Sequence, residues 1–462
     1  MTRPLLIGSG AGFSGDRVDA GLPVVREIAR QGGGVIIYET IGERTLALGQ
    51  SAYQRDPSTG YEPLLEQYLE PVLAEALAGG VAIVGNFGCA NPVAAARSIG
   101  ALVDRLGLSR PRIAVVEGDD ILPDFDPQAA LSWEQDDALP LPPGGLLSAN
   151  AYTGAQGIAD ALRSGAQIVV TGRVADPALA LGPLVAHHGW DWMDHDLIAA
   201  GTLAGHLLEC GSQVSGGYFA DPGCKNVPGM AEIGFPIGSI ATDGTLDLFK
   251  PPATGGCITR ATVSEQLLYE VHDPTAYVTP DVVLDLTGVR LEEIGVDRVR
   301  VTGARGHPPP SHLKVTVGYE GHWFGEAEIS YAGPGCTGRA RLAAETLEQR
   351  LCMRALPLLG RRVDIVGINS SFGDDAGNYM RGHPDPVVPE VRVRLAVRTE
   401  TRESADAAMQ ELLALYCCGP AGGGGVRTHV ARRVETRSCL YPRHLVEERV
   451  SFVGPEGLGV CS

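Results

Sequence analysis

The side chains best suited to chemistry follow two short apolar runs. Asn86 follows Val81–Val84, and Arg173 follows Ile168–Val170. Asp176 comes three residues after Arg173. An arginine binds a carboxylate or phosphate through two parallel hydrogen bonds, and a carboxylate can transfer a proton. We therefore expect Arg173 to bind an anion and Asp176 to move a proton. An Arg173–Asp176 ion pair that only holds the loop is the alternative.

Further polar residues surround this pair in the sequence. Asn150 and Tyr152 precede it, and Thr171 lies between the apolar run and Arg173. Amide and phenol groups can donate hydrogen bonds to a developing oxyanion. We expect Asn86, Asn150 and Tyr152 to orient a substrate carbonyl, with Thr171 lining the same site.

A second candidate for proton transfer lies on a predicted helix over 196–211. His206, Glu209 and Cys210 lie on this helix, and positions 206 and 210, four residues apart, share a face. His206 is predicted to be a general base oriented by Glu209. A buried structural histidine is the alternative.

A glycine-rich segment follows the first apolar run. Gly10, Gly12 and Gly15 fit the pattern GxGxxG, with Ser14 inside it, and Glu39 follows 24 residues after Gly15. This spacing is typical of a dinucleotide site, where helix amides bind the pyrophosphate and an acid binds the ribose. NAD(P) is therefore a possible cofactor, although Asp16 would repel a pyrophosphate. Another anion, or a tight turn without a ligand, is the alternative.

Five apolar runs, each followed by small and polar residues, must position these side chains. Runs of this kind are typical of parallel strands buried on both faces, and ligands bind at the carboxyl ends of such strands. The sequence predicts an α/β fold with a Rossmann-like parallel sheet and helices on both faces. The strands are expected at Leu5–Ile7, Val35–Ile37, Val81–Val84, Ile113–Val116 and Ile168–Val170. Helices are expected at Leu22–Gln31, Pro63–Ala78, Pro92–Leu106, Ala155–Ser164 and Pro177–His187.

The pattern changes near residue 280. From there, β-rich segments alternate with two helix candidates, and a glycine-rich loop spans Gly419–Gly425. We expect two domains, an α/β substrate- and anion-binding domain over 1–280 and an α+β domain over 281–462.

Charge and cysteine usage exclude several classes of partner. The net charge of −18 argues against nucleic acid or a membrane surface as the main partner. The ten cysteines form no CxxC pair and no zinc pattern, which favours reduced thiols in the cytoplasm and no metal. No apolar run is long enough to predict a membrane-spanning helix. We expect a small-molecule substrate and a homo-oligomer.

Together these segments resemble the acyclic terpene utilisation proteins of the AtuA type. The resemblance runs from Ile7 to about Val450 and is strongest in Gly10–Arg17, Asn86–Pro92, Ser148–Asp176, Ala199–Asp221 and Lys250–Pro280. It implies a bacterial-type cytoplasmic catabolic protein encoded beside acyl-CoA enzymes. It supplies no established reaction and no catalytic residues.

Three hypotheses follow for the function. The first is a lyase or hydratase that acts on an acyl-CoA or branched carboxylic acid, with a CoA thioester as substrate. The second is an NAD(P)-dependent oxidoreductase built on the glycine segment and Glu39. The third is a non-catalytic scaffold subunit that binds an acyl-CoA.

Overall fold

The computed structural model forms two compact units. Unit 1 comprises Met1–Gly318 with Thr436–Ser462, and unit 2 comprises Tyr319–Glu435. The sequence analysis placed its boundary near residue 280, whereas these units divide at 318/319 and 435/436. The structure describes residues 3–133, 145–371, 373, 382, 388–454 and 457–460.

An eleven-stranded mixed sheet is the centre of unit 1. Its strand order is β12-β13-β9-β8-β1-β2-β3-β7-β4-β19-β20. The five central strands run parallel, as predicted: β1 (Leu5–Ala11), β2 (Gly34–Tyr38), β3 (Val81–Gly85), β7 (Ile168–Thr171) and β4 (Ile113–Glu117).

The predicted parallel sheet is the core of a larger mixed sheet. Antiparallel strands continue the sheet on either side: β8 (Ile237–Ile240), β9 (Leu246–Phe249), β13 (Arg298–Thr302), β12 (Arg290–Gly295), β19 (Arg449–Gly454) and β20 (Gly457–Val460). Short connections join β8 to β9 and β12 to β13, and a short connection can only join antiparallel neighbours. Strands β12, β13 and β19, which the sequence analysis assigned to the second domain, therefore extend the first sheet.

Helices cover both faces of the parallel core, as predicted. One face packs against α1 (Gly21–Arg30), α3 (Leu65–Leu69), α4 (Leu73–Ala78) and α5 (Pro92–Arg105). The other packs against α6 (Gln156–Arg163), α7 (Ala178–His188) and α8 (His195–Glu209). Strands β1, β2 and β3 lie side by side in chain order, and β4 lies one position beyond β3. The chain then turns back, and β7 fills the position between β3 and β4. Right-handed crossovers place the helices of the return path on the opposite face.

Local sequence signals explain several helix boundaries. Asn91 caps α5, and its Oδ1 accepts from the Ala94 amide at 3.1 Å, with Pro92 as the first helical residue. The predicted helix over Pro63–Ala78 is instead the pair α3 and α4. Pro71 lies between them, where it supplies no amide and disfavours helical geometry in the preceding residue. Helix α2 (Glu43–Arg55) was not predicted.

The segment after unit 2 returns to unit 1 and fixes the start of α6. The two carboxylate oxygens of Glu448 accept from the amides of Gly154, at 3.0 Å, and Gly157, at 2.8 Å. The Asp281 carboxylate accepts from the Ala155 amide at 3.0 Å. These acids satisfy amides that the first turn of a helix leaves without a partner.

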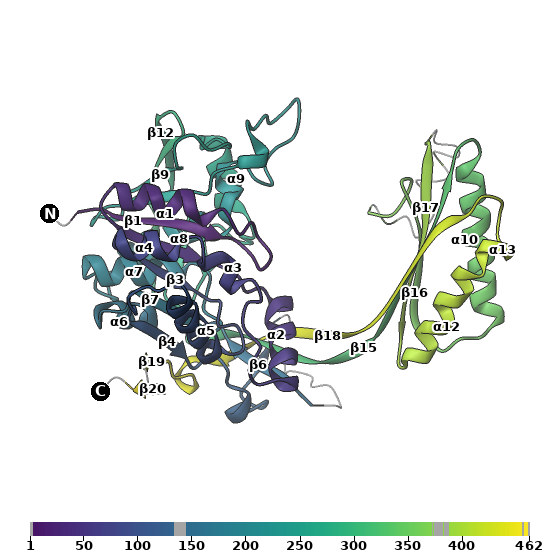
Figure 1. The fold of residues 1–462 in the computed structure, drawn as a ribbon, viewed down its shortest axis with the longest axis horizontal. Coiled ribbons are helices and arrows are strands. Elements are labelled where there is room, and N and C mark those ends of the chain that lie inside the picture. The colour runs from purple at the N-terminus through teal and green to yellow at the C-terminus, as the bar shows by residue number, and fades with distance from the viewer. Residues whose placement is uncertain are drawn as a thin grey trace. The chain divides into compact units, whose positions relative to one another are not determined.

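Unit 2 is an antiparallel sheet with helices on one face (Figure 1). Its strands are β16 (Leu358–Val366), β17 (Glu390–Thr399), β15 (His312–Ala332) and β18 (Gly424–Pro442). Helices α10 (Cys336–Met353) and α12 (Arg402–Leu413) pack on apolar side chains of β15 and β17. The unit-1 ends of β15 and β18 pair with the short strands β6 (Ser148–Ala151) and β5 (Leu131–Ser132). No helix in the part of the chain that the structure describes is long and apolar enough to cross a bilayer.

Candidate functional site

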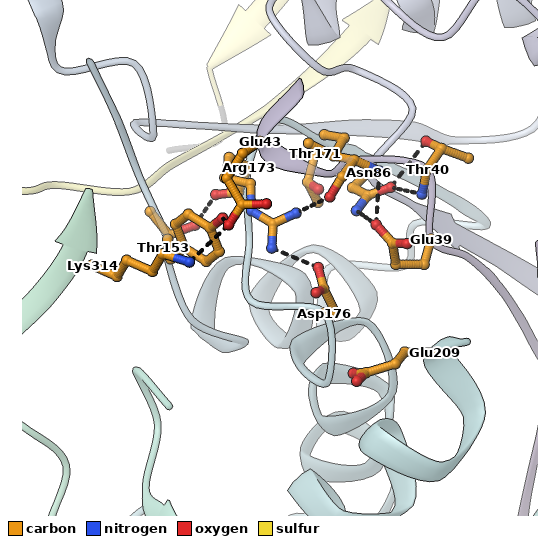
Figure 2. Close-up of polar contacts among 12 residues, drawn as sticks. Glu39, Thr40, Glu43, Asn86, Thr153, Thr171, Arg173, Asp176, Glu209 and Lys314 are labelled. Carbon is orange, nitrogen blue, oxygen red and sulfur yellow. Dashed lines mark hydrogen bonds and ion pairs between the residues drawn. The ribbon is translucent and has the colours of Figure 1, made fainter. Parts of the chain in front are cut away.

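The carboxyl ends of β2, β3 and β7 bring most of the predicted site residues together. Glu39 follows β2, Asn86 follows β3, and Arg173 and Asp176 follow β7. Figure 2 shows these side chains as one polar cluster, in which Asp176 lies between Arg173 and Glu209. We call this cluster the rim site.

Arg173 is the buried centre of the rim site. Its side chain is 2% exposed, and Nη2 contacts Asp176 Oδ1 at 2.6 Å. Nη1 donates to the Ile41 carbonyl, and the guanidinium lies 4.0 Å from the centroid of the Tyr152 ring. Protein groups therefore take up two edges and one face of the guanidinium. This geometry corresponds to the loop-holding ion pair, the alternative given for Arg173 above.

Asn86 binds Glu39 on one side and Thr40 on the other. Its Nδ2 donates to Glu39 Oε1 at 3.0 Å, and its Oδ1 accepts from the Thr40 amide at 2.7 Å. Burial raises the pKa of Glu39 well above its usual value, and the nearby charge of Asp176 adds to the rise. Since both ends of its amide are occupied, Asn86 positions Glu39 in this structure.

Tyr152 connects Arg173 to a charged pair that the sequence analysis missed. The Tyr152 hydroxyl donates to Glu43 Oε1 at 2.7 Å, and Lys314 Nζ contacts the same oxygen at 2.8 Å. Lys314 also lies 4.5 Å from the centroid of the Tyr152 ring. Although Glu43 is partly buried, Lys314 and Tyr152 lower its pKa to about 2. Glu43 therefore stays ionised, and Lys314, 29% exposed, is a cation that solvent can reach.

His206 and Glu209 lie on α8, as predicted, and contact each other. His206 Nδ1 lies 3.0 Å from Glu209 Oε1, and Nε2 lies 3.2 Å from the Leu267 carbonyl. A carbonyl only accepts, so Nε2 carries a proton, and Nδ1 and the carboxylate share the next one. Both ring nitrogens of His206 thus have protein partners, whereas the buried Oε2 of Glu209 has none.

Burial and neighbouring charges bring the pKa of Glu209 close to neutral pH. Burial raises the pKa of Glu209 to about 7, against the opposing effect of His206, and the charges of Asp176 and Glu270 add to the rise. Although burial disfavours its charge, His206 has a raised pKa because it faces the Glu209 carboxylate. An acid that titrates near pH 7 can both accept and donate a proton at that pH.

The glycine segment after β1 is closed on itself. The Gly12 amide donates to Asp16 Oδ2 at 2.9 Å, and the Gly15 amide donates to the Tyr68 hydroxyl at 3.2 Å. Asp16 thus occupies an amide that a bound phosphate would need. Ser14 is half-buried and interacts with Glu62. The arrangement favours the turn without a ligand over the dinucleotide site.

Close packing explains two of these glycines without a ligand. A Cβ on Gly12 would lie 2.4 Å from the Cys210 carbonyl carbon at the end of α8. A Cβ on Gly10 would lie 2.5 Å from the Tyr38 ring. Both distances are too short for non-bonded carbon atoms, so any side chain would displace a neighbour.

A family comparison identifies the chain as a whole. The model of the acyclic terpene utilisation family protein AtuA matches residues 5–452, from the start of β1 into β19. The chain belongs to the AtuA family. Membership implies a role in acyclic terpene utilisation. A search of curated proteins found no match to this chain.

Two predicted residues of this AtuA family member lie deeper in the structure. Asn150 is fully buried, and its amide accepts from Gln50 at 3.1 Å and donates to Asp119 at 2.9 Å. Thr171 is also fully buried and donates to the Gly172 carbonyl at 2.9 Å. Asp119 in turn accepts from the Arg173 amide at 2.8 Å. Asn150 and Asp119 thus hold the loop that carries Arg173.

The sequence analysis missed Glu43 and Lys314 because no motif marks them as site residues. Glu43 begins a helix that was not predicted, and Lys314 lies in β15, about 160 residues beyond its contact Tyr152. Among the described residues, no group of three or more His, Cys, Asp or Glu side chains could hold a metal ion.

Proposed function

We propose that this chain is an enzyme of terpene catabolism that acts on an acyl-CoA or branched carboxylic acid as a lyase or hydratase. In this proposal Glu209 transfers the proton. The observation that carries the proposal is the buried Oε2 of Glu209, which has no partner and belongs to a group with a pKa of about 7. AtuA family membership supports the substrate class.

The chemistry of such substrates needs a group that both removes and returns a proton. In the hydration of an unsaturated thioester, ionised Glu209 removes a proton from water while the water oxygen bonds to the β-carbon of the substrate. The protonated form then gives the proton to the α-carbon. Cleavage of a β-hydroxy thioester uses the same group to remove the hydroxyl proton as the carbon–carbon bond breaks, and then to return that proton to the α-carbon of the released thioester.

The neighbouring residues have distinct supporting roles in this proposal. His206 fixes the Glu209 carboxylate through Oε1, and Asp176 raises its pKa by charge. Arg173 holds Asp176 in place and is not itself the anion contact. Lys314 takes that role, because part of its side chain remains accessible beside Tyr152.

The test is a turnover screen of acyl-CoAs and branched acids by mass spectrometry, with a matched pair of variants. In Glu209→Gln, an amide oxygen can still accept from His206 but cannot take up a proton. We expect kcat to fall by about 10²–10⁴ while the variant stays folded. Glu265→Gln, at an exposed pair with Lys225, should keep wild-type activity. Wild-type turnover by Glu209→Gln, or no turnover of any such substrate by the folded wild type, would refute the proposal.

A further inference from the structure

A cavity lies at the amino ends of β1 and β2, whereas the rim site lies at the carboxyl ends of the parallel strands. It is open to solvent and has a volume of about 370 Å³, between the turn before β2, the start of β1 and the last turns of α6 and α7. Strand β1 has seven residues, so the cavity and the rim site are roughly 20 Å apart along the sheet. A ligand in the cavity would therefore not touch the residues proposed for catalysis.

The charged lining of this cavity is entirely basic among the described residues. Arg3, Arg163 and His187 line it, and no aspartate or glutamate does. In a chain with a net charge of −18, this lining brings two arginines together. Anions accumulate where fixed cations gather, even on an acidic protein.

The two guanidinium groups are held in place but keep free donors. Arg3 Nη1 donates to the Gly32 carbonyl at 3.2 Å, and Arg163 Nη2 donates to the Val185 carbonyl at 3.2 Å. Arg163 also faces Asp160 at 3.5 Å, outside the lining. Because a guanidinium has five N–H donors, both arginines retain donors for an anion. The backbone contacts orient them before any ligand arrives.

The remaining wall is apolar. Leu5, Val35 and Pro183 line it beside the glycine turn. Gly32 and Gly33 have φ values of +98° and +96°, and a Cβ on Gly32 would lie 2.7 Å from Arg3 Nη1. The glycine turn thus leaves room for the Arg3 guanidinium. The volume is at the lower end of the range for small-molecule sites, about 300–1,000 Å³.

We propose that this cavity binds a small amphipathic anion, with a carboxylate or phosphate head group on Arg3 and Arg163 and a short apolar body on Leu5, Val35 and Pro183. The inference does not depend on the proposed function. The head group of such a ligand would match the arginines, and its apolar body would match the apolar side chains of the lining.

Calorimetric titration with three probes of the same chain length tests the inference. Octanoate and octyl phosphate carry the two head groups, and octanol carries none. We expect saturable binding of at least one anion and binding of octanol weaker by about tenfold or more. The tighter anion identifies the head group. No saturable binding of either anion, or equal binding of octanol, would overturn the inference.

Variants locate the binding. Arg3→Gln and Arg163→Gln should each weaken anion binding by about tenfold, because each removes a positive charge from the head group. Both side chains are exposed, so we expect both variants to fold. Arg110→Gln, at an exposed pair with Asp104, should bind as the wild type does. Glu209→Gln should also bind normally, which separates this cavity from the rim site. Unchanged anion binding in both cavity variants would show that the anion binds elsewhere, and would overturn the inference.

Discussion

At the scale of single residues, Arg173 shows how a buried charge organises its surroundings. It contacts an acid, a carbonyl and an aromatic ring from three different segments. A buried charge is tolerated only when such partners replace its hydration. Arg173 is thus a structural requirement of the rim site before it is anything else.

Arg173→Ala should destabilise the protein by about 2–4 kcal/mol, because the Ile41 carbonyl and the partly exposed Asp176 would lose their buried partner. Urea denaturation measures the change. Arg26→Ala, at an exposed pair with Glu75, should cost much less, because solvent screens that pair. Equal effects of the two substitutions would contradict the structural role of Arg173.

Gly12→Ala should destabilise unit 1 by about 1–3 kcal/mol, because the new Cβ meets backbone atoms of Cys210 and Gly211 that cannot swing aside. Gly42→Ala is the control, since a Cβ there meets nothing within 4 Å. It should cost less than about 1 kcal/mol. A thermal melt that ranks Gly42→Ala as the more damaging change would be evidence against the packing explanation.

The residue scale also shows what sequence reasoning could not reach. The sequence analysis paired His206 with Glu209, and the two side chains do contact each other. The sequence could not show that the carbonyl of Leu267, about 60 residues later, contacts His206 Nε2. It also could not show that Glu209 Oε2 is the atom left without a partner. Likewise, the glycine segment matches a dinucleotide pattern, but its explanation lies in a contact with residue 210. Both outcomes depend on tertiary neighbours.

At the scale of elements, the parallel core was predictable because each signal is local. Buried strands are continuous apolar runs, and Asn91 followed by Pro92 defines a helix start within three residues. The antiparallel edges and the long strands β15 and β18 were not predictable in the same way. Their segments look like several short strands, since Gly318 and Gly321 interrupt the alternation in β15. Pairing across the sheet, and not local pattern, makes them continuous.

Helix α5 offers a test at this scale. Gly100 lies inside α5, and a Cβ there meets nothing within 4 Å. Gly100→Ala should stabilise the protein by about 0.5–1 kcal/mol, because alanine loses less backbone freedom on folding. Urea denaturation measures this change in the free energy of unfolding. A loss of stability would mean that α5 needs the glycine for a contact that the structure does not show.

At the scale of the whole molecule, buried acids determine how stability depends on pH. Burial raises the pKa of several carboxyl groups into the range between about 6 and 7: Asp119, Asp281, Glu209 and Glu448. His206 is shifted upward as well. Between pH 5 and 8 the folded chain therefore holds more protons than the unfolded chain, and stability must fall as pH rises.

We expect the free energy of unfolding to decrease by at least about 2 kcal/mol from pH 5 to pH 8, since one unit of pKa shift corresponds to about 1.4 kcal/mol. Urea titrations at fixed ionic strength across this range measure it. A flat or rising profile would show that these groups are not shifted as described.

Asp119→Asn isolates one of these groups. Asp119 Oδ2 accepts both hydrogen bonds, and an amide oxygen in its place can accept both as well. The variant should match the wild type below about pH 4, where the carboxyl is protonated in both states, and be more stable at pH 8, by roughly 1–3 kcal/mol. Its pH profile should therefore be shallower than that of the wild type. A parallel profile would remove Asp119 from the set.

The passage of the chain into unit 2 has an evolutionary consequence. The chain enters along β15 and leaves along β18, which are neighbours in one sheet. The Gly321 carbonyl accepts from Arg432 at 3.1 Å, so the two crossings run side by side. Unit 2 is therefore an insertion whose ends nearly meet, and a single hairpin turn could replace it. One internal gain or loss of sequence can exchange this module, while every strand that carries the rim site keeps its order and register.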